Sequence, residues 1–210
     1  MAKTAAHIIY RNLAGRPVPG ATTALAVLNK PALVSWANRL GLQGIDSSKY
    51  VDDKAVIGTL AHYMIISYLQ RTEPNLSDYS QNQIDQAETC LIKFWDWEKE
   101  HSLSTVLTET PFVSEAYNFG GTIDWYGKIN DHFTLIDFKT SSGIFPEMSY
   151  QLAAYSQLLR EHSYLLPQSR IIRVGRNQDE GFEERVYTDL QTQWQIFEHC
   201  LAIYNLRKKG

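Results

Sequence analysis

Cysteine is scarce in this sequence, and long apolar runs are missing. The 210 residues include two cysteines, Cys90 and Cys200, which are too few for a disulfide scaffold, a four-cysteine zinc site or an all-cysteine iron–sulfur cluster. No stretch approaches the roughly 18 consecutive apolar residues of a membrane span, and the first residues lack the apolar stretch and cleavage site of a signal peptide. We therefore expect a reduced, cytoplasmic protein without a membrane partner.

A large net charge is also missing. The 20 Lys and Arg against 23 Asp and Glu give −3, which neither supports nor excludes a nucleic acid partner, because binding depends on where the positive charge lies. Residues 1–50 carry +5, residues 51–150 carry −9 and residues 151–210 carry +1. The hydrophobic share of 44% is that of a globular protein and excludes a disordered or fibrous chain. The acids gather in the middle of the chain, where the candidate chemistry lies.

Hydrophobic periodicity predicts an α/β protein with a mixed sheet. The first fifty residues read as short helices, one of which begins at Pro31, has Leu33 and Trp36 on its apolar stripe and stops at Gly41. Further helices are expected at about 53–70, with Tyr68 on the apolar stripe, and at 80–99, 146–160 and 190–204. Three consecutive antiparallel strands are expected within 104–140, and two more at 171–174 and 183–187. This order excludes an alternating βαβ fold. It predicts one domain over residues 1–210, with a helical N-terminal segment (1–50) and a core (51–210) whose central sheet is flanked by helices.

Two carboxylates and a lysine fall on neighbouring predicted strands. In LIDFKT, Leu135 and Ile136 face opposite sides, which is typical of a central strand covered on both faces. Asp137 and Lys139 lie two apart, on one face, and taken alone are better explained as a structural ion pair. Asp124 lies on the preceding strand, and a short turn would set its carboxylate beside that of Asp137. Two converging carboxylates call for a divalent cation, and oxygen ligands without cysteine favour Mg²⁺ or Mn²⁺.

Two helices carry polar side chains four residues apart. In GTLAH, Gly58 is expected to leave open space on the helix surface beside His62, which flanks the apolar stripe and does not fill it. In QLAAY, Gln151 and Tyr155 share one face of the helix that follows LIDFKT. Tyr155 alone is better explained as a core residue. The pair directly after an acid-x-lysine strand is less easily explained by packing.

The motifs GTLAH, GGTID, IDFKT and QLAAY, taken in order, resemble the PD-(D/E)XK nuclease superfamily, in particular its RecB-like branch of phage-type exonucleases. The resemblance spans about residues 17–159, and it is specific because four motifs occur in the right order with the right elements between them. It implies a restriction-endonuclease-like core. One departure is that helicase-linked and CRISPR-associated members often hold an iron–sulfur cluster, which two cysteines cannot supply.

The resemblance also implies a role for each matched residue. Gln151 and Tyr155 would support the site and contact the DNA backbone. Glu109 matches an acid that precedes the GxxD motif, although the residues alone leave open whether it or Glu115 faces the site. The implied metal ligands are His62, Asp124, Asp137 and the backbone carbonyl of Phe138; the implied catalytic residues are Asp124, Asp137, Lys139, Gln151, Tyr155 and Glu109.

Residues and resemblance together predict a Mg²⁺- or Mn²⁺-dependent deoxyribonuclease, most simply an exonuclease that acts on DNA ends in recombination, repair or replication. A structure-specific endonuclease of the same fold, a noncatalytic DNA-binding module and a hydrolase of another phosphate ester are the alternatives. The resemblance implies a bacterial or phage-infected cell, DNA as the partner, and a single-strand annealing protein or a helicase as a protein partner, which no residue identifies.

Positive charge for a polymer substrate has two candidate locations. The N-terminal segment offers Arg16, Lys30 and Arg39, with Arg11 nearby, although ordinary solvated charges explain these residues equally well. Trp125 and Tyr126 are candidates for stacking on unpaired bases, whereas Trp36 is expected in the core. The second location is the late hairpin, with Arg170, Arg173, Arg176 and Arg185.

Overall fold

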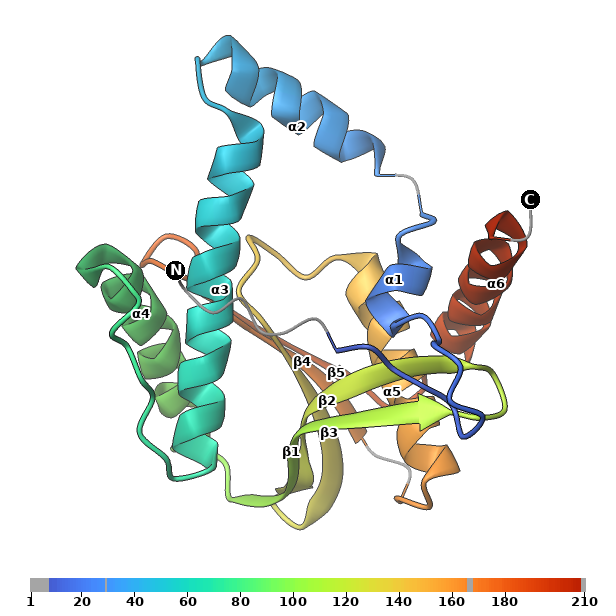
Figure 1. The fold of residues 1–210 in the computed structure, drawn as a ribbon. Coiled ribbons are helices and arrows are strands. Elements are labelled where there is room, and N and C mark those ends of the chain that lie inside the picture. Colours follow the sequence, from blue (N-terminus) through green and yellow to red (C-terminus); the bar gives the residue numbers. More distant parts are fainter. Residues whose placement is uncertain (1–7, 29, 166–167, 209–210) are drawn as a thin grey trace.

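A five-stranded mixed β-sheet forms the centre of the protein (Figure 1). The computed structural model describes residues 8–28, 30–165 and 168–208. The strands lie side by side in chain order, and each neighbouring pair is antiparallel except β3 and β4, which are parallel. Their bounds are β1 Leu103–Ser114, β2 Phe119–Ile129, β3 His132–Lys139, β4 Gln168–Val174 and β5 Phe182–Tyr187.

Helices cover both faces of this sheet. Their bounds are α1 Ala21–Leu25, α2 Pro31–Leu42, α3 Ser47–Leu69, α4 Gln81–Glu98, α5 Pro146–Glu161 and α6 Gln191–Arg207. The helices α3 and α4 pack together on one face, and α1, α5 and α6 pack together on the other (Figure 1). The predicted mixed sheet flanked by helices is therefore confirmed, including the three consecutive antiparallel strands.

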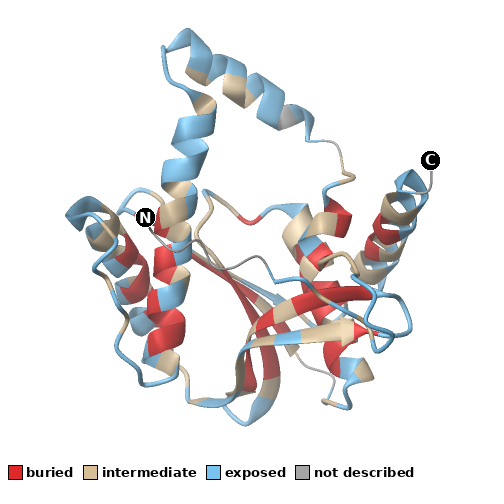
Figure 2. Ribbon diagram, in the orientation of Figure 1, coloured by how far each residue is buried: buried red, intermediate tan, exposed pale blue. Residues whose placement is uncertain are grey.

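Each face of the sheet has its own apolar core, drawn as buried residues in Figure 2. Leu135 belongs to the core beneath α5 and α6, and the next residue, Ile136, belongs to the core beneath α3 and α4. Both side chains are fully buried. The prediction that LIDFKT is a central strand covered on both faces is confirmed.

Two helix ends differ from the prediction because of polar groups that periodicity does not report. The helix α3 begins at Ser47, earlier than expected, since Asp46 Oδ1 accepts hydrogen bonds from the backbone of Ser48 and Lys49 at 2.8 and 3.2 Å. The predicted stop at Gly41 is wrong: α2 continues to Leu42, and Gly44, with φ of +73°, follows its end.

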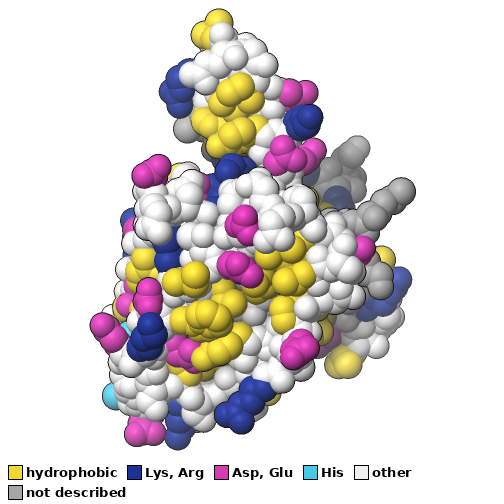
Figure 3. All heavy atoms as spheres, turned by 90° about the vertical axis from the view of Figure 1, so that its left-hand side faces the viewer, with side chains coloured by type: hydrophobic (Ala, Val, Ile, Leu, Met, Phe, Trp, Pro, Cys, Tyr) yellow, Lys and Arg dark blue, Asp and Glu magenta, His cyan; other side chains and the backbone are white. Residues whose placement is uncertain are grey.

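Three predicted apolar-stripe residues are not part of a core. Tyr68 is 41% exposed, and its hydroxyl donates a hydrogen bond to Glu98. Hydrophobic side chains, Tyr68 and Trp95 among them, gather on the surface over α3 and α4 (Figure 3). Leu33 is 53% exposed and Trp36 is half-buried, because α2 stands away from the sheet and contacts little besides the start of α3 (Figure 2).

Neither cysteine is available at the surface, since Cys90 and Cys200 are both free and buried. Within residues 8–28, 30–165 and 168–208, no helix combines the length and the apolar character needed to cross a bilayer.

The glycines of GGTID allow two aromatic rings to lie directly against β2. A Cβ atom on Gly120 would overlap the ring of Tyr10, and one on Gly121 would lie 2.5 Å from Tyr155 Cε1. Tyr10 is fixed in this position by a 2.8 Å hydrogen bond between its hydroxyl and Thr122 Oγ1. The motif therefore has a packing reason: it brings α5 and the N-terminal segment close to the strand that carries Asp124.

Replacing Gly121 by alanine is expected to destabilise the protein by about 1–3 kcal/mol, because the new methyl group overlaps Tyr155 and pushes α5 from β2. Gly41→Ala is the matched control. No atom lies within 4 Å of its added Cβ, and its position is helical, so alanine should stabilise α2 by up to about 1 kcal/mol. Thermal unfolding measures both variants, and equal shifts in Tm would contradict this account of the motif.

Candidate active site

Three potential metal ligands from three elements lie close together. His62 projects from α3, Glu109 from β1 and Asp124 from β2, and one ligand atom of each lies within 4.8 Å of the other two. His62 Nε2 is 3.2 Å from Asp124 Oδ2, and His62 Nδ1 is 3.3 Å from Glu109 Oε1. We refer to these three side chains as the ligand cluster.

The two carboxylates of the ligand cluster favour a positive charge between them. Burial would lower the pKa of His62, but the carboxylates of Asp124 and Glu109 outweigh burial and raise it to about 9. Burial likewise opposes ionisation of Asp124, but His62 and Lys139 hold the pKa of this carboxyl below its usual value. Burial raises the pKa of Glu109. The imidazolium thus occupies the place of a cation between two acids.

The hairpin β2–β3 sets Asp124 beside the end of β3, as the sequence predicts. The antiparallel register pairs Trp125 with Ile136, which places Asp124 beside Asp137. Asp124 Oδ2 accepts a 2.9 Å hydrogen bond from the backbone N–H of Phe138. This bond fixes the carboxylate that also contacts His62.

Four further residues form a continuous polar chain next to the ligand cluster. Lys139 Nζ lies 2.8 and 2.7 Å from the two carboxylate oxygens of Asp137 and 3.3 Å from Gln151 Oε1. Gln151 Nε2 donates a 2.7 Å hydrogen bond to the Tyr155 hydroxyl. The predicted strand pair, Asp137 and Lys139, therefore contacts the predicted helix pair, Gln151 and Tyr155. Tyr155 is buried, which agrees with its expected core position, and its hydroxyl reaches the polar chain.

Asp137, which the resemblance implies as a metal ligand, lies beside the ligand cluster and is not one of its three members. Its carboxylate is fully buried and bound to Lys139, and the ligand cluster contains Glu109 in its place. Burial raises the pKa of Asp137, although Lys139 opposes this effect. Its Oδ2 atom lies 2.7 Å from Lys139 Nζ but accepts no hydrogen bond of good geometry from the described residues. A buried carboxylate oxygen with an unused lone pair beside an imidazole and two further carboxylates fits a hard divalent cation such as Mg²⁺ or Mn²⁺.

The structure distinguishes the two glutamates that the sequence leaves open. Glu109 faces the ligand cluster, and its backbone has a φ of +45°, which is unusual for a residue that is not glycine. Glu115 lies beyond the end of β1, where Oε1 accepts a hydrogen bond from the backbone of Leu13 at 2.8 Å. The left-handed backbone at Glu109 lies within the continuous strand β1 and belongs to the same site as its carboxylate.

The expectation of open space at Gly58 is wrong. A Cβ atom there would lie 2.5 Å from Thr140 Oγ1, so the space above the glycine is filled by the residue that follows β3. The glycine instead lets α3 approach the end of β3 closely. This approach holds His62, one turn later on α3, against Glu109 and Asp124.

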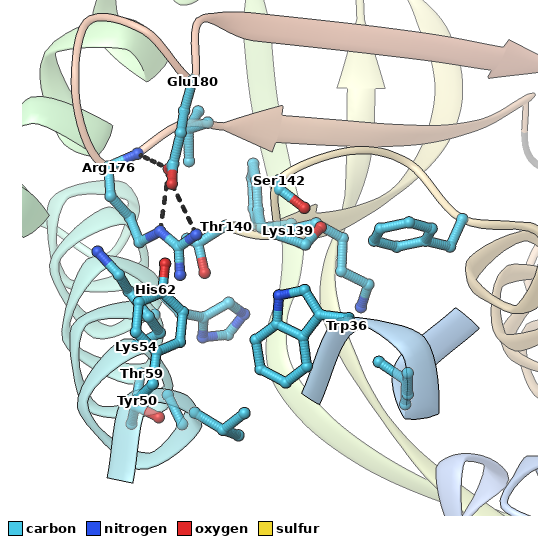
Figure 4. A pocket seen from close by; sticks show the side chains of 18 of the residues that line it. Trp36, Tyr50, Lys54, Thr59, His62, Lys139, Thr140, Ser142, Arg176 and Glu180 are labelled. Carbon is cyan, nitrogen blue, oxygen red and sulfur yellow. Dashed lines mark hydrogen bonds and ion pairs between the residues drawn. The ribbon is translucent and has the colours of Figure 1, made fainter. Parts of the chain in front are cut away.

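A cavity of about 940 Å³ opens from this site (Figure 4). His62 and Lys139 line it at the site, and α2, the first half of α3, the segment after β3 and the turn between β4 and β5 supply the other walls. Its polar and aromatic lining includes Trp36, Arg39, Tyr50, Lys54, Thr140 and Arg176.

The predicted DNA-binding cations lie in three different settings. Arg39 lines the cavity. Lys30 forms an ion pair with Glu147 at 2.5 Å, which links the start of α2 to the start of α5. Arg16 is exposed in the loop before α1, which is held to the β1–β2 turn by a hydrogen bond between Asn12 and Asn118. Of these three cations, Arg39 is the one that lines the cavity.

The arginines of the late hairpin all have acidic partners. Arg170 pairs with Glu184, Arg173 and Arg185 pair with Glu183, and Arg176 pairs with Glu180. These pairs explain the charges structurally, although Arg176 also lines the cavity.

The aromatic predictions are reversed by the structure. Trp125 and Tyr126 are buried in the cores and cannot stack on bases, whereas Trp36 lines the cavity. Sequence reasoning also missed Tyr50 and Lys54, which line the cavity one helical turn apart at the start of α3. The signal was available: an aromatic and a basic residue at i and i+4, ahead of the GTLAH motif.

Comparison with solved structures identifies the fold. A protein from Eubacterium rectale that carries an exonuclease assignment matches 71% of this chain over 68% of its own length, with a TM-score of 0.50 and 13% identity. This likeness confirms the predicted nuclease-type fold. The alkaline exonuclease LHK-Exo from Laribacter hongkongensis matches 71% of this chain over 81% of its own length, with 14% identity and a TM-score of 0.35. The structure of LHK-Exo in complex with dAMP matches 70% of this chain over 76% of its own length, with 13% identity and a TM-score of 0.43. No family model and no curated protein sequence matches the chain.

Proposed function

We propose that this protein is a Mg²⁺- or Mn²⁺-dependent deoxyribonuclease that hydrolyses phosphodiester bonds at DNA ends. The observation that carries the proposal is the ligand cluster of His62, Glu109 and Asp124 with the Asp137–Lys139 pair directly beside it. A histidine and carboxylates next to a lysine, on a fold shared with a protein assigned as an exonuclease, support phosphodiester hydrolysis better than they support a structural ion-pair network.

The ligand cluster and Asp137 Oδ2 are the groups that would hold the cation. When bound, Mg²⁺ or Mn²⁺ supplies positive charge that offsets the charge of the phosphodiester and acidifies water. The Phe138 N–H orients Asp124 for this task through its 2.9 Å hydrogen bond. The backbone carbonyl of Phe138, at the end of the same strand, is proposed as a further ligand.

Lys139 is the residue that would act on the phosphate or on the attacking water. Its ammonium group has three N–H donors. Asp137 and Gln151 accept two of them, so that one can reach into the cavity. Burial disfavours the charged form, but Asp137 and Asp124 raise the pKa of Lys139 above its ordinary value. A protonated lysine supports electrostatic stabilisation of the developing negative charge rather than general-base catalysis.

Gln151 and Tyr155 are proposed as positioning residues. Gln151 accepts from Lys139 and donates to the Tyr155 hydroxyl, which holds the amide in one orientation. Contact of this pair with the DNA backbone is part of the proposal. Because both residues lie on α5, the pair would fix the position of the Lys139 ammonium group relative to this helix.

The experiment that tests the function compares DNA substrates and metals. End-labelled linear DNA, single- and double-stranded, and a covalently closed circle are incubated with the protein in Mg²⁺, Mn²⁺ or EDTA. We expect loss of linear DNA in Mg²⁺ or Mn²⁺ only, with the circle intact. Cutting of the circle would change the proposal to an endonuclease, whereas equal loss of DNA in EDTA and Mg²⁺ would overturn the metal dependence. Binding without any cleavage would overturn the enzyme assignment.

A further inference from the structure

The wall of the cavity opposite the ligand cluster carries two aromatic rings that face open space. Trp36 of α2 and Tyr50 of α3 pack edge to face, with ring centroids 5.9 Å apart and an interplanar angle of 63°. Tyr50 is 40% exposed, whereas Trp97 and Trp125 are buried in the core. Figure 4 shows the Trp36 indole directed into the cavity, on the side where Lys139 lies.

Two cations beside these rings have no acidic partner. Lys54 Nζ lies 5.8 Å from the centre of the Tyr50 ring, and Arg39 lines the cavity from α2, one turn after Trp36. No carboxylate lies within ion-pair distance of either residue in the described part of the chain. Glu180 is the acid that lines the cavity, and Arg176 already binds it. Aromatic rings that line a cavity beside cations without an acidic partner match the chemistry of nucleobases and phosphates.

The size and position of the cavity restrict what can bind. Its volume of about 940 Å³ is in the range of pockets that enclose small ligands, which gives room for a few unpaired nucleotides. The helix α2 supplies one wall of the cavity, and the Lys30–Glu147 ion pair ties the start of this helix to α5. Trp36, Lys139 and His62 line this one cavity.

We propose that this cavity binds the unpaired end of a DNA strand, in which one base stacks on Trp36 and neighbouring phosphates contact Arg39 and Lys54. The inference rests on the proposed function only in placing the reacting phosphate at Lys139. It assigns single-stranded DNA, or a frayed end, as the substrate form. Specificity for one base is not expected, because a ring face stacks on any base.

Binding without cleavage tests the stacking of a base on Trp36. The Kd of a fluorescent 12-nucleotide oligo(dT) is measured in EDTA for the wild type, Trp36→Ala and Trp36→Phe. Alanine should raise the Kd by about 5- to 150-fold, the equivalent of one base that no longer stacks, and phenylalanine should restore most of the affinity. Trp95→Ala is the matched control, because Trp95 is 37% exposed on α4 outside the cavity, and its Kd should stay within about twofold of the wild type.

An abasic oligonucleotide of the same length isolates the base contribution. Wild type and Trp36→Ala should bind it with equal Kd, since the phosphates are unchanged and no base can stack. If Trp36→Ala binds oligo(dT) as tightly as the wild type, or weakens the abasic strand and a blunt duplex to the same degree, the stacking site is overturned. Circular dichroism verifies that the variants fold.

The salt dependence of binding tests the ion pairs with phosphate. For a single strand, each cation removed from the binding surface should flatten the slope of log K against log salt by about 0.7, so Arg39→Ala combined with Lys54→Ala should flatten it by about 1.4. Lys99→Ala, which lies on the loop after α4 and pairs with Asp96, is the control and should leave the slope unchanged. An unchanged slope in the double variant would overturn the role of Arg39 and Lys54 at the phosphates.

Failure of the inference and failure of the proposed function give different results. Oligo(dT) binding that depends on Trp36, without cleavage in any metal, would keep the binding site and overturn the nuclease. Metal-dependent cleavage with kcat and KM unaffected by Trp36→Ala would keep the nuclease and overturn the binding site.

Discussion

Asp124→Asn is expected to reduce cleavage of linear DNA by about 1,000-fold or more while DNA binding in EDTA stays equal or becomes tighter. The substitution keeps the shape of the side chain and removes one of the two carboxylates that flank His62. A neutral amide is a poor ligand for Mg²⁺ and no longer repels phosphate at this position. The rate of product release at saturating Mg²⁺ and the Kd for the same DNA measure the two effects.

Glu115→Gln is the matched control for this variant. Glu115 follows the same strand as Glu109, yet it lies at the β1–β2 turn and contacts the backbone of Leu13. Its cleavage rate should remain within about twofold of the wild type. Cleavage by Asp124→Asn at the wild-type rate, or an equal loss in Glu115→Gln, would contradict the assignment of the ligand cluster.

Lys139→Ala is expected to lower kcat by about 100- to 1,000-fold and to leave the affinity for Mn²⁺ unchanged. In the proposed function the lysine stabilises negative charge at the reacting phosphate, and removing one such donor from a preorganised site has effects of this size. It is not a member of the ligand cluster, so the cation retains its ligands. Single-turnover cleavage measures the rate, and calorimetric titration with Mn²⁺ measures the affinity.

Lys128→Ala provides the comparison on the same hairpin. Lys128 lies over the ring of Phe133, outside the lining of the cavity, so its loss should leave kcat within about twofold of the wild type. If excess Mn²⁺ restores cleavage by Lys139→Ala, then the lysine acts on metal affinity, and its proposed role at the phosphate is wrong.

The elements around the polar chain could be predicted because their signals are local. The two-residue period of LIDFKT sets Asp137 and Lys139 on one face, and the four-residue spacing of QLAAY does the same for Gln151 and Tyr155. The hairpin then brings Asp124 alongside, since a short turn fixes its register.

The remaining features depend on contacts between distant segments. The period of α2 predicts an apolar stripe, but whether Trp36 enters a core or a cavity depends on where the helix lies relative to α3. Whether Gly58 leaves open space or allows a close helix–strand contact depends on Thr140, which is distant in the sequence. The choice of Glu109 over Glu115 depends on a backbone angle that no residue pattern reports.

The left-handed backbone of Glu109 sets stability and activity against each other at one residue. A φ of +45° is a conformation that glycine adopts freely and that costs other residues roughly 1–2 kcal/mol. Glycine would therefore relieve the strand, but it would remove a carboxylate from the ligand cluster. A stable fold alone would favour glycine here, and the proposed metal-binding role of the carboxylate is what would offset the cost in stability.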